Sequence, residues 1–405
     1  MEQCSWIASL HEFGRIFGAL GAGFFLETYS RRNTLITTSI FFFLLWPPVI
    51  FVRQILLIYC IRFVLGMAVG MNDTCSTIYL GENSSPEYRG IFGSVSIAFY
   101  YAGILFEFVL ASYLPYNTTA ITNSVITFLA LFGTYTLKES PQYLILKKKY
   151  EKAESNFYWL KGTNENREDF AKLRQIIQEE NANKLTFKKL ATTSLYYKPV
   201  LIVLVLCMLV MLSGFASVTS FVSIAFSESL IFTPNQFTIL FGLLQLITAC
   251  ISPFFIEKYN RRSIMTIAFL LAAVAHGCTA ILFFINENIS SVPYFSYLIF
   301  ITITSYSMVF SGGIHGIYFS IRSELFPQNV KEIGSSVTII GQSLVGFLSS
   351  KIFLYLSDMY GVYMNFVVFF IVCIFGVIYV YFFLPETRGK TLAEIQESFN
   401  LNKLK

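Results

Sequence analysis

Long apolar runs separated by short polar segments follow one another along almost the whole chain. A helix that crosses the hydrocarbon core of a bilayer needs about 20 mostly apolar residues. Eleven segments reach this length: 6–26, 34–52, 55–80, 90–114, 118–137, 199–226, 234–255, 263–284, 293–319, 337–357 and 362–384. The pattern predicts an all-α membrane protein with eleven transmembrane helices.

One long polar stretch, 138–198, divides the predicted spans into five and six. It carries three consecutive lysines at 147–149, followed by helical spacing of apolar residues at 151–160 and 170–180. We expect an N-terminal helical bundle at 1–137, a cytosolic linker with short helices at 138–198, a C-terminal bundle at 199–387 and a cytosolic tail at 388–405.

The positive charges fall on one side of the predicted spans. Alternate loops at 27–33, 82–90, 138–198, 256–262 and 320–332, with the tail, hold nearly all Lys and Arg, whereas the other loops contain only Arg53. Basic loops stay in the cytosol, so we expect a cytosolic C-terminus. The glycosylation sequons at Asn117 and Asn288 fall on the outer side, where acceptor sites must lie, and they favour the plasma membrane as the location.

The composition agrees with a bilayer as the solvent. Hydrophobic residues make up 55% of the chain and charged residues 13%, against about a quarter charged in soluble domains. The seven cysteines have no paired spacing and predict neither disulfides nor a metal site. No catalytic constellation, phosphate loop or basic nucleic-acid patch is present in the sequence, so we expect no enzyme, no cofactor and no nucleic-acid partner.

A charged pattern occurs twice. The segment Glu-Thr-Tyr-Ser-Arg-Arg at 27–32 has a counterpart, Glu-Lys-Tyr-Asn-Arg-Arg, at 257–262. Seven residues separate Glu82 from Arg89, and seven separate Glu324 from Lys331. Charges are costly beside lipid, so a pattern kept twice at one membrane edge indicates two related halves. Two repeats are the architecture of a transporter that moves one bundle against the other.

Eleven spans do not divide into equal halves. A twofold repeat therefore predicts one further helix ahead of residue 1, and we expect the chain to be an incomplete gene model or an isoform. The alternative is a protein that works with eleven helices.

Several motifs keep a fixed order along the chain: Ser5–Leu10, Ser30–Asn33, Arg62–Gly66, Tyr79–Glu82, Arg89–Gly90, Glu139–Pro141 and Pro385–Leu392. In these motifs the chain resembles the sugar porters of the major facilitator superfamily, most of all the insect facilitated trehalose transporters. The resemblance implies two pseudo-symmetric bundles and facilitated diffusion of a small polar solute by alternating access. It makes a sugar, trehalose or glucose, the leading substrate.

The resemblance also implies a cytosolic charge network that forms a latch between the bundles. Arginines at the inner helix ends would bridge to carboxylates of neighbouring helices. The residues assigned to it are Arg31, Arg32, Glu82, Arg89 and Glu139 in one half, and Arg261, Arg262, Glu324, Lys331 and Glu386 in the other. The alternative is that the arginine pairs only fix the topology.

The chain departs from the family in its predicted sugar site. Val210, Met211 and Ala216 replace two amides and an asparagine, and a pocket that lacks hydrogen-bond partners discriminates against a sugar. Gln245, Gln342 and Phe319 remain as residues that would line a central cavity. The alternatives are hydrogen bonds between helices for the glutamines and packing for Phe319.

Charged residues inside the spans are further candidates. Asp73 lies mid-span, where a carboxylate faces the protein interior or a water-filled cavity. It either binds a cationic substrate or a proton, or pairs with Arg15. Glu12 and Arg15 share a helix face, and Lys351 lies near an outer helix end, where it can reach the headgroups.

Two other readings of the sequence stay open. The altered pocket fits a carrier for another organic solute, and it also fits a non-transporting sensor or a degenerate relative. The oligomeric state is not indicated by the sequence.

Overall fold

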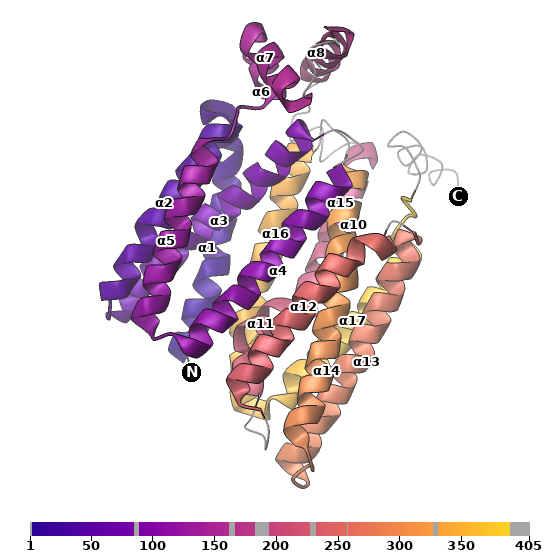
Figure 1. The fold of residues 1–405 in the computed structure, drawn as a ribbon. Coiled ribbons are helices and arrows are strands. Elements are labelled where there is room, and N and C mark those ends of the chain that lie inside the picture. The colour runs from indigo at the N-terminus through magenta and orange to yellow at the C-terminus, as the bar shows by residue number, and fades with distance from the viewer. Residues whose placement is uncertain are drawn as a thin grey trace.

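The computed structural model describes residues 2–84, 89–161, 167–182, 194–226, 232–256, 258–326 and 331–388. Within these ranges the chain is helical apart from turns and short connections, and its long helices run side by side in two groups (Figure 1). The N-terminal half contains α1 Glu2–Tyr29, α2 Arg31–Phe51, α3 Ile55–Asn83, α4 Arg89–Tyr113 and α5 Tyr116–Tyr135.

The C-terminal half has the same kind of long helices, two of them interrupted. It contains α10 Ser194–Leu212, α11 Phe215–Ala225, α12 Pro234–Ile256, α13 Arg261–Asn288, α14 Phe295–Val309, the π-helical turn η1 Phe310–Ile314, α15 His315–Leu325, α16 Lys331–Tyr360 and α17 Tyr363–Phe383. The interruptions fall at glycine residues. Gly214 separates α10 from α11 with a left-handed φ of 99°, a conformation that glycine adopts without strain.

In the described part of the connection between the halves lie three short helices: α6 Pro141–Leu146, α7 Tyr150–Lys161 and α8 Arg167–Ala182. They stand over one end of the bundles, the end at which α17 also finishes, while α1 begins at the opposite end (Figure 1). We call these the linker end and the far end. The connecting helices share a small apolar core made of Leu144, Ile145, Ala153, Phe170 and Ile177.

Glycines bring α1 and α3 unusually close together. Gly14 and Gly18 on α1 face the backbone of α3 at Phe63 and Met67, and Gly66 and Gly70 on α3 face the backbone of α1. Both pairs have the small-xxx-small spacing that lets transmembrane helices approach closely. This packing fixes the rotation of α1 against α3 and so the direction of their charged side chains.

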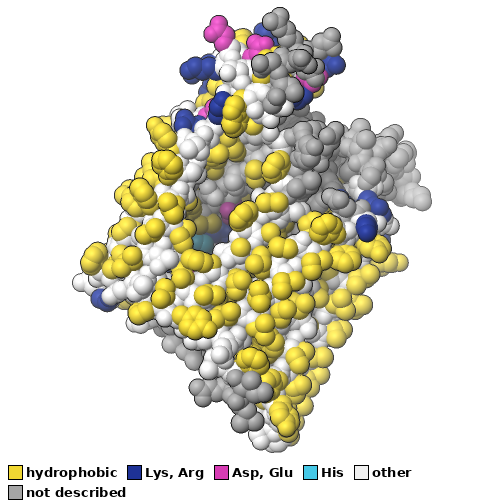
Figure 2. All heavy atoms as spheres, in the orientation of Figure 1, with side chains coloured by type: hydrophobic (Ala, Val, Ile, Leu, Met, Phe, Trp, Pro, Cys, Tyr) yellow, Lys and Arg dark blue, Asp and Glu magenta, His cyan; other side chains and the backbone are white. Residues whose placement is uncertain are grey.

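The two halves meet along two helix pairs, α1 with α16 and α4 with α12. In the C-terminal half α10 packs against both α16 and α17, whereas α4 and α5 of the N-terminal half have little contact with each other. Figure 2 shows a hollow beside α4 in which acidic, basic and histidine side chains are visible.

The surface of the bundles is suited to lipid. Nine spans of the described residues are long and apolar enough to cross a membrane, and large apolar side chains such as Phe24, Phe132 and Phe254 are mostly exposed. Hydrophobic side chains cover the flanks of the bundles in Figure 2. The remaining long helices, α1 and α5, have 28 and 20 residues and run beside these nine spans.

Candidate functional site

Arg31 is held in a buried position at the linker end of the N-terminal half. It lies at the start of α2 and is only 4% exposed. Its Nε and Nη2 donate to Glu82 Oε1 at 3.1 and 3.0 Å, and its Nη1 donates to the carbonyl oxygen of Leu26 at 3.3 Å. The guanidinium also lies 5.0 Å from the centre of the Tyr143 ring. A buried arginine is tolerated here because its charge is paired and its donors are used.

Tyr143 connects this group to the linker. It lies on α6, outside the long helices, and burial together with the nearby Glu139 carboxylate raises the pKa of its phenol. The ring presents its face to Arg31.

Glu139 lies in the chain segment after α5 and contacts the start of α2 at the linker end. Its Oε1 accepts from the backbone N–H of Arg32 at 3.3 Å and from that of Ser140 at 3.1 Å. The first N–H groups of a helix have no partner within the helix, and a carboxylate there is favoured by the helix dipole. Glu139 is therefore a cap for α2 supplied from another segment of the chain. Arg32 completes the contact by donating to the carbonyl oxygen of Tyr135 at 2.8 Å.

The C-terminal half repeats this arrangement. Glu386 accepts from the backbone N–H of Arg261 at 3.1 Å and of Arg262 at 3.2 Å, and so caps α13. Arg261 Nη1 donates to the carbonyl oxygen of Ile256 at 2.7 Å, five residues earlier, as Arg31 does to Leu26. Arg262 Nη2 donates to the carbonyl oxygen of Tyr381 and lies over its ring, as Arg32 does at Tyr135. The pattern read twice in the sequence is thus two copies of one set of contacts.

These described pairs join helices of the same half. Arg31–Glu82 and Arg32–Glu139 lie within the first half, and Glu386 with its two arginines lies within the second. The structure thus shows them holding each half together, and the bridge between bundles expected of them is not among these pairs. The side chains of three further network residues lie outside the described residues: Arg89, Glu324 and Lys331.

A second charged cluster lies between α1 and α3, away from the linker end. Arg15 donates to Glu12 Oε2 at 2.9 Å and to Asp73 Oδ2 at 2.8 Å. The Asp73 side chain is 39% exposed, whereas those of Arg15 and Glu12 are 14% and 17% exposed. His11 also belongs to this cluster, with its Nδ1 3.8 Å from Glu12 Oε1, and Asp73 is more exposed than either Arg15 or Glu12. Both pairings considered from the sequence are present in the structure.

Three of the four predicted substrate residues are spread over three helices of the C-terminal half, and the fourth, Asp73, lies on α3. Gln245 on α12 is fully buried, and both polar atoms of its amide lack a partner among the described residues. Gln342 lies half-buried on α16. Phe319 lies on α15, with its ring centre 5.3 Å from that of His315. His315 is hydrogen-bonded through Nδ1 to the Tyr101 hydroxyl of α4 at 3.0 Å, so this contact joins the halves.

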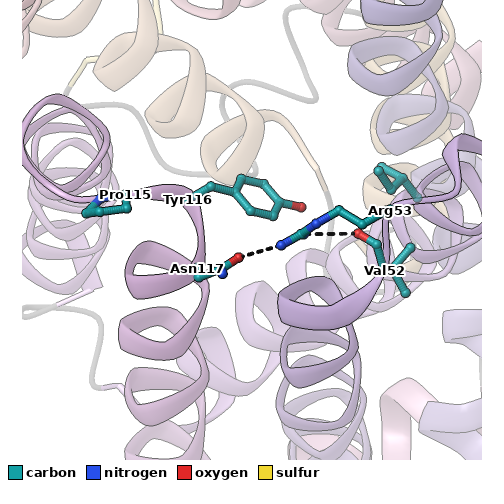
Figure 3. A pocket seen from close by; sticks show the side chains of 6 residues that line it. Val52, Arg53, Pro115, Tyr116 and Asn117 are labelled. Carbon is teal, nitrogen blue, oxygen red and sulfur yellow. Dashed lines mark hydrogen bonds between the residues drawn. The ribbon is translucent and has the colours of Figure 1, made fainter.

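Both sequons lie at the far end. Asn117 is in the first turn of α5 and Asn288 is the last residue of α13, and both are exposed. Asn117 accepts from Arg53 Nη2 at 2.9 Å, and the guanidinium lies over the Tyr116 ring (Figure 3). The shallow pocket around them is lined by Val52, Arg53, Ile58, Pro115, Tyr116 and Asn117, away from the predicted substrate residues.

Sequence reasoning missed Arg322. The sequence placed it in the basic loop 320–332, but the structure puts it inside α15, 5% exposed, with Nη2 donating to Thr77 Oγ1 of the other half at 3.1 Å. Lys351 was expected to reach the headgroups, which stays a prediction. Its ammonium lies 3.5 Å from the centre of the Trp6 ring. Neither partner could be read from hydropathy, because each depends on how the two halves pack.

Two helical bundles with duplicated charge contacts and an apolar exterior define a membrane carrier of the major facilitator fold. The sequence profile of the family "Sugar (and other) transporter" matches residues 1–399, and the chain belongs to this family.

Known proteins resemble the chain over nearly its full length. It is 26% identical to the facilitated trehalose transporter Tret1 of Polypedilum vanderplanki and 25% identical to that of Bombyx mori, in each case over 98% of this chain and 79% of the relative. The fold is similar to that of the xylose transporter XylE from E. coli in a partially occluded inward-open conformation. The TM-score is 0.81, with 17% identity over 97% of this chain and 90% of XylE. The matched relatives are transporters and not enzymes.

Proposed function

We propose that this chain carries a small polar solute across a membrane by alternating access and facilitated diffusion, without a cofactor. A sugar is the leading substrate, with trehalose and glucose first, because relatives that match nearly the whole chain are named as trehalose transporters. The observation that carries the proposal is the duplicated set of contacts at the linker end. Each copy fixes the helix ends of its own half, and alternating access requires halves that move as rigid units.

The solute would bind between the halves. We assign Gln245, Gln342, Phe319 and Asp73 to this site, and Gln245 supports the assignment best. A buried amide without a partner costs about 1–3 kcal/mol, and a bound solute or water that hydrogen-bonds to it removes this penalty. Phe319 would offer an apolar face to a sugar ring. Asp73 would present the exposed part of its carboxylate to the same space.

The test is uptake of labelled trehalose and glucose in oocytes, with the amount of protein at the cell surface measured for every variant. We expect saturable uptake by the unchanged chain. Gln245→Leu should lower uptake or raise the KM at an equal surface level. Gln178→Leu, on the exposed side of α8, is the matched control and should leave uptake unchanged. No flux of either sugar from protein at the surface would exclude them as substrates.

A carrier for a different organic solute is the second candidate. It is favoured by the exposed part of the Asp73 carboxylate and by the apolar residues Val210 and Met211, where related carriers have amides. Flux of a cationic solute that is lost in Asp73→Asn would support it. A sensor or degenerate relative predicts a third outcome, sugar binding without flux or no binding at all.

We also propose that the linker end faces the cytosol, that the far end faces outward at the plasma membrane, and that Asn117 and Asn288 carry glycans. The positions of both sequons at the far end support this orientation. Treatment with a glycosidase should shift the unchanged chain on a gel and leave the double variant Asn117→Gln/Asn288→Gln unshifted. A protease applied from the cytosolic side should cut the 138–198 linker. Cutting from the outside alone would reverse the orientation.

A further inference from the structure

Two cationic side chains of the C-terminal half reach across to the N-terminal half at opposite ends of the molecule. Arg322 on α15 donates to Thr77 on α3, in the part of both helices that leads to the linker end. Lys351 on α16 lies over Trp6 on α1, and Trp6 is in the second turn of a helix that begins at the far end. We call these the linker-end contact and the far-end contact.

The linker-end contact is built around a buried charge. Arg322 is 5% exposed, and its guanidinium lies 5.2 Å from the centre of the Phe319 ring on its own helix. Its partner Thr77 follows Asp73 by four residues on α3, so the carboxylate lies one turn away on the same helix face. A carboxylate so close to Thr77 favours a cation there. A neutral hydroxyl accepts the hydrogen bond, so the contact can break without leaving two unpaired charges.

The far-end contact joins the same two halves through a cation–π interaction. An ammonium group over the face of a tryptophan is attracted by the ring quadrupole. The neighbouring side chains of the same helix pair are tightly packed: Phe13 lies 5.3 Å from Phe347 between ring centres, and Gly346 adjoins the side chain of Glu12. Lys351 is half-buried, so the interaction is partly removed from water.

We propose that Arg322–Thr77 and Lys351–Trp6 are opposing positioning contacts that set the balance between the two open states of the carrier. This inference rests on the proposed transport function and names residues that set its conformational equilibrium. When the linker end opens, the linker-end contact must break, and when the far end opens, the far-end contact must break. A contact that exists in one state and not in the other shifts the equilibrium by its free energy. In the present structure both contacts are made.

The two contacts therefore predict shifts of opposite sign. Arg322→Ala and Thr77→Val should increase the population with an open linker end. Lys351→Met and Trp6→Leu should increase the population with an open far end. Hydrogen bonds in membrane proteins and cation–π pairs are of a strength that shifts a population ratio about threefold to tenfold. Thr77→Ser and Lys351→Arg keep the interacting groups and should leave the ratio near its original value.

The experiment is a measurement of distances between spin labels in the full-length, cysteine-depleted protein in lipid nanodiscs. Labels at Tyr29 and Tyr259 report the linker end, and labels at Phe51 and Met359 report the far end. All four positions are more than half exposed and outside the two contacts. Arg322→Ala should broaden the Tyr29–Tyr259 distances towards longer values, and Lys351→Met should do so for Phe51–Met359. The thermal unfolding temperature is recorded for every variant.

The outcomes separate this inference from the proposed function. The inference is supported when Arg322→Ala and Lys351→Met lengthen the distances at opposite ends of the molecule. The conservative variants Thr77→Ser and Lys351→Arg should then leave the distances unchanged. Shifts in the same direction, or a lower unfolding temperature with unchanged distances, overturn the inference and leave both pairs as packing contacts. The distances need no substrate. Opposite shifts without sugar flux would therefore uphold the contacts while the proposed substrate fails.

Discussion

Arg31 shows at the scale of one residue how a charge is kept inside a membrane protein. Its guanidinium has the Glu82 carboxylate on one side, the Leu26 carbonyl on another and the Tyr143 ring nearby. The sequence predicted that Arg31 and Glu82 belong together in a network. It did not show that Arg31 would be almost fully buried, because the burial comes from α3 and α6, which lie far away in the sequence.

Replacing Glu82 by Gln tests this pair. The substitution keeps the shape but removes the charge that Arg31 needs, and breaking a buried ion pair costs about 3–5 kcal/mol. We expect a marked drop in thermal unfolding temperature, measured by size-exclusion chromatography of heated protein. Glu151→Gln, at an exposed position of α7, is the control and should change stability by less than about 0.5 kcal/mol. Equal unfolding temperatures for the two variants would contradict the pairing.

At the scale of helices, glycine spacing determines how closely α1 and α3 pack. A Cβ added at Gly66 would overlap the carbonyl oxygen of His11, and one at Gly70 would overlap that of Arg15. The same closeness brings Arg15 within hydrogen-bonding distance of Asp73. The charged cluster therefore depends on residues that have no side chain.

Gly66→Leu should disrupt this packing. A larger side chain forces the helices apart, which removes van der Waals contacts and stretches the Arg15–Asp73 ion pair. We expect loss of monodisperse protein on size-exclusion chromatography. Gly21→Leu on α1 meets no neighbour within 4 Å and should behave like the unchanged chain. A well-folded Gly66→Leu protein would show that the close approach is dispensable.

The two capping glutamates give a second prediction for helices. Glu139 and Glu386 cap α2 and α13 in different halves and share no partner. Exchange to Gln keeps an acceptor and removes the charge, and loss of a helix cap costs about 0.5–2 kcal/mol. We expect Glu139→Gln and Glu386→Gln to have similar effects that add in the double variant, because distant sites are independent. A double variant much less stable than the sum would indicate direct coupling of the two sites.

The whole molecule consists of two halves joined by a linker with its own small core. The halves touch along α1–α16 and α4–α12, and Gly242 of α12 lies against Phe108 and Leu105 of α4. Such an interface is held by packing and does not require a continuous chain. The linker then serves mainly to keep the two halves at high effective concentration.

Two fragments, 1–161 and 167–405, should therefore assemble when they are expressed together. We expect the untagged fragment to copurify with the tagged one in detergent. Gly242→Trp places a large ring against Phe108 and should abolish copurification. Fragments that never associate, although each is produced in the membrane, would show that the covalent linker is needed to form the interface.

The sequence by itself determined the all-α membrane fold, the division into two halves and the position of the duplicated charges. Hydropathy and the cost of a charge in lipid act on each segment separately, so these features can be read without knowing the neighbours. Only the tertiary structure decided that Glu139 and Glu386 cap helices, that Gln245 is fully buried and that Arg322 and Lys351 reach across the halves. Those facts depend on the rotation and distance of packed helices. The glycines of α1 and α3, which let the two helices approach closely, are an example.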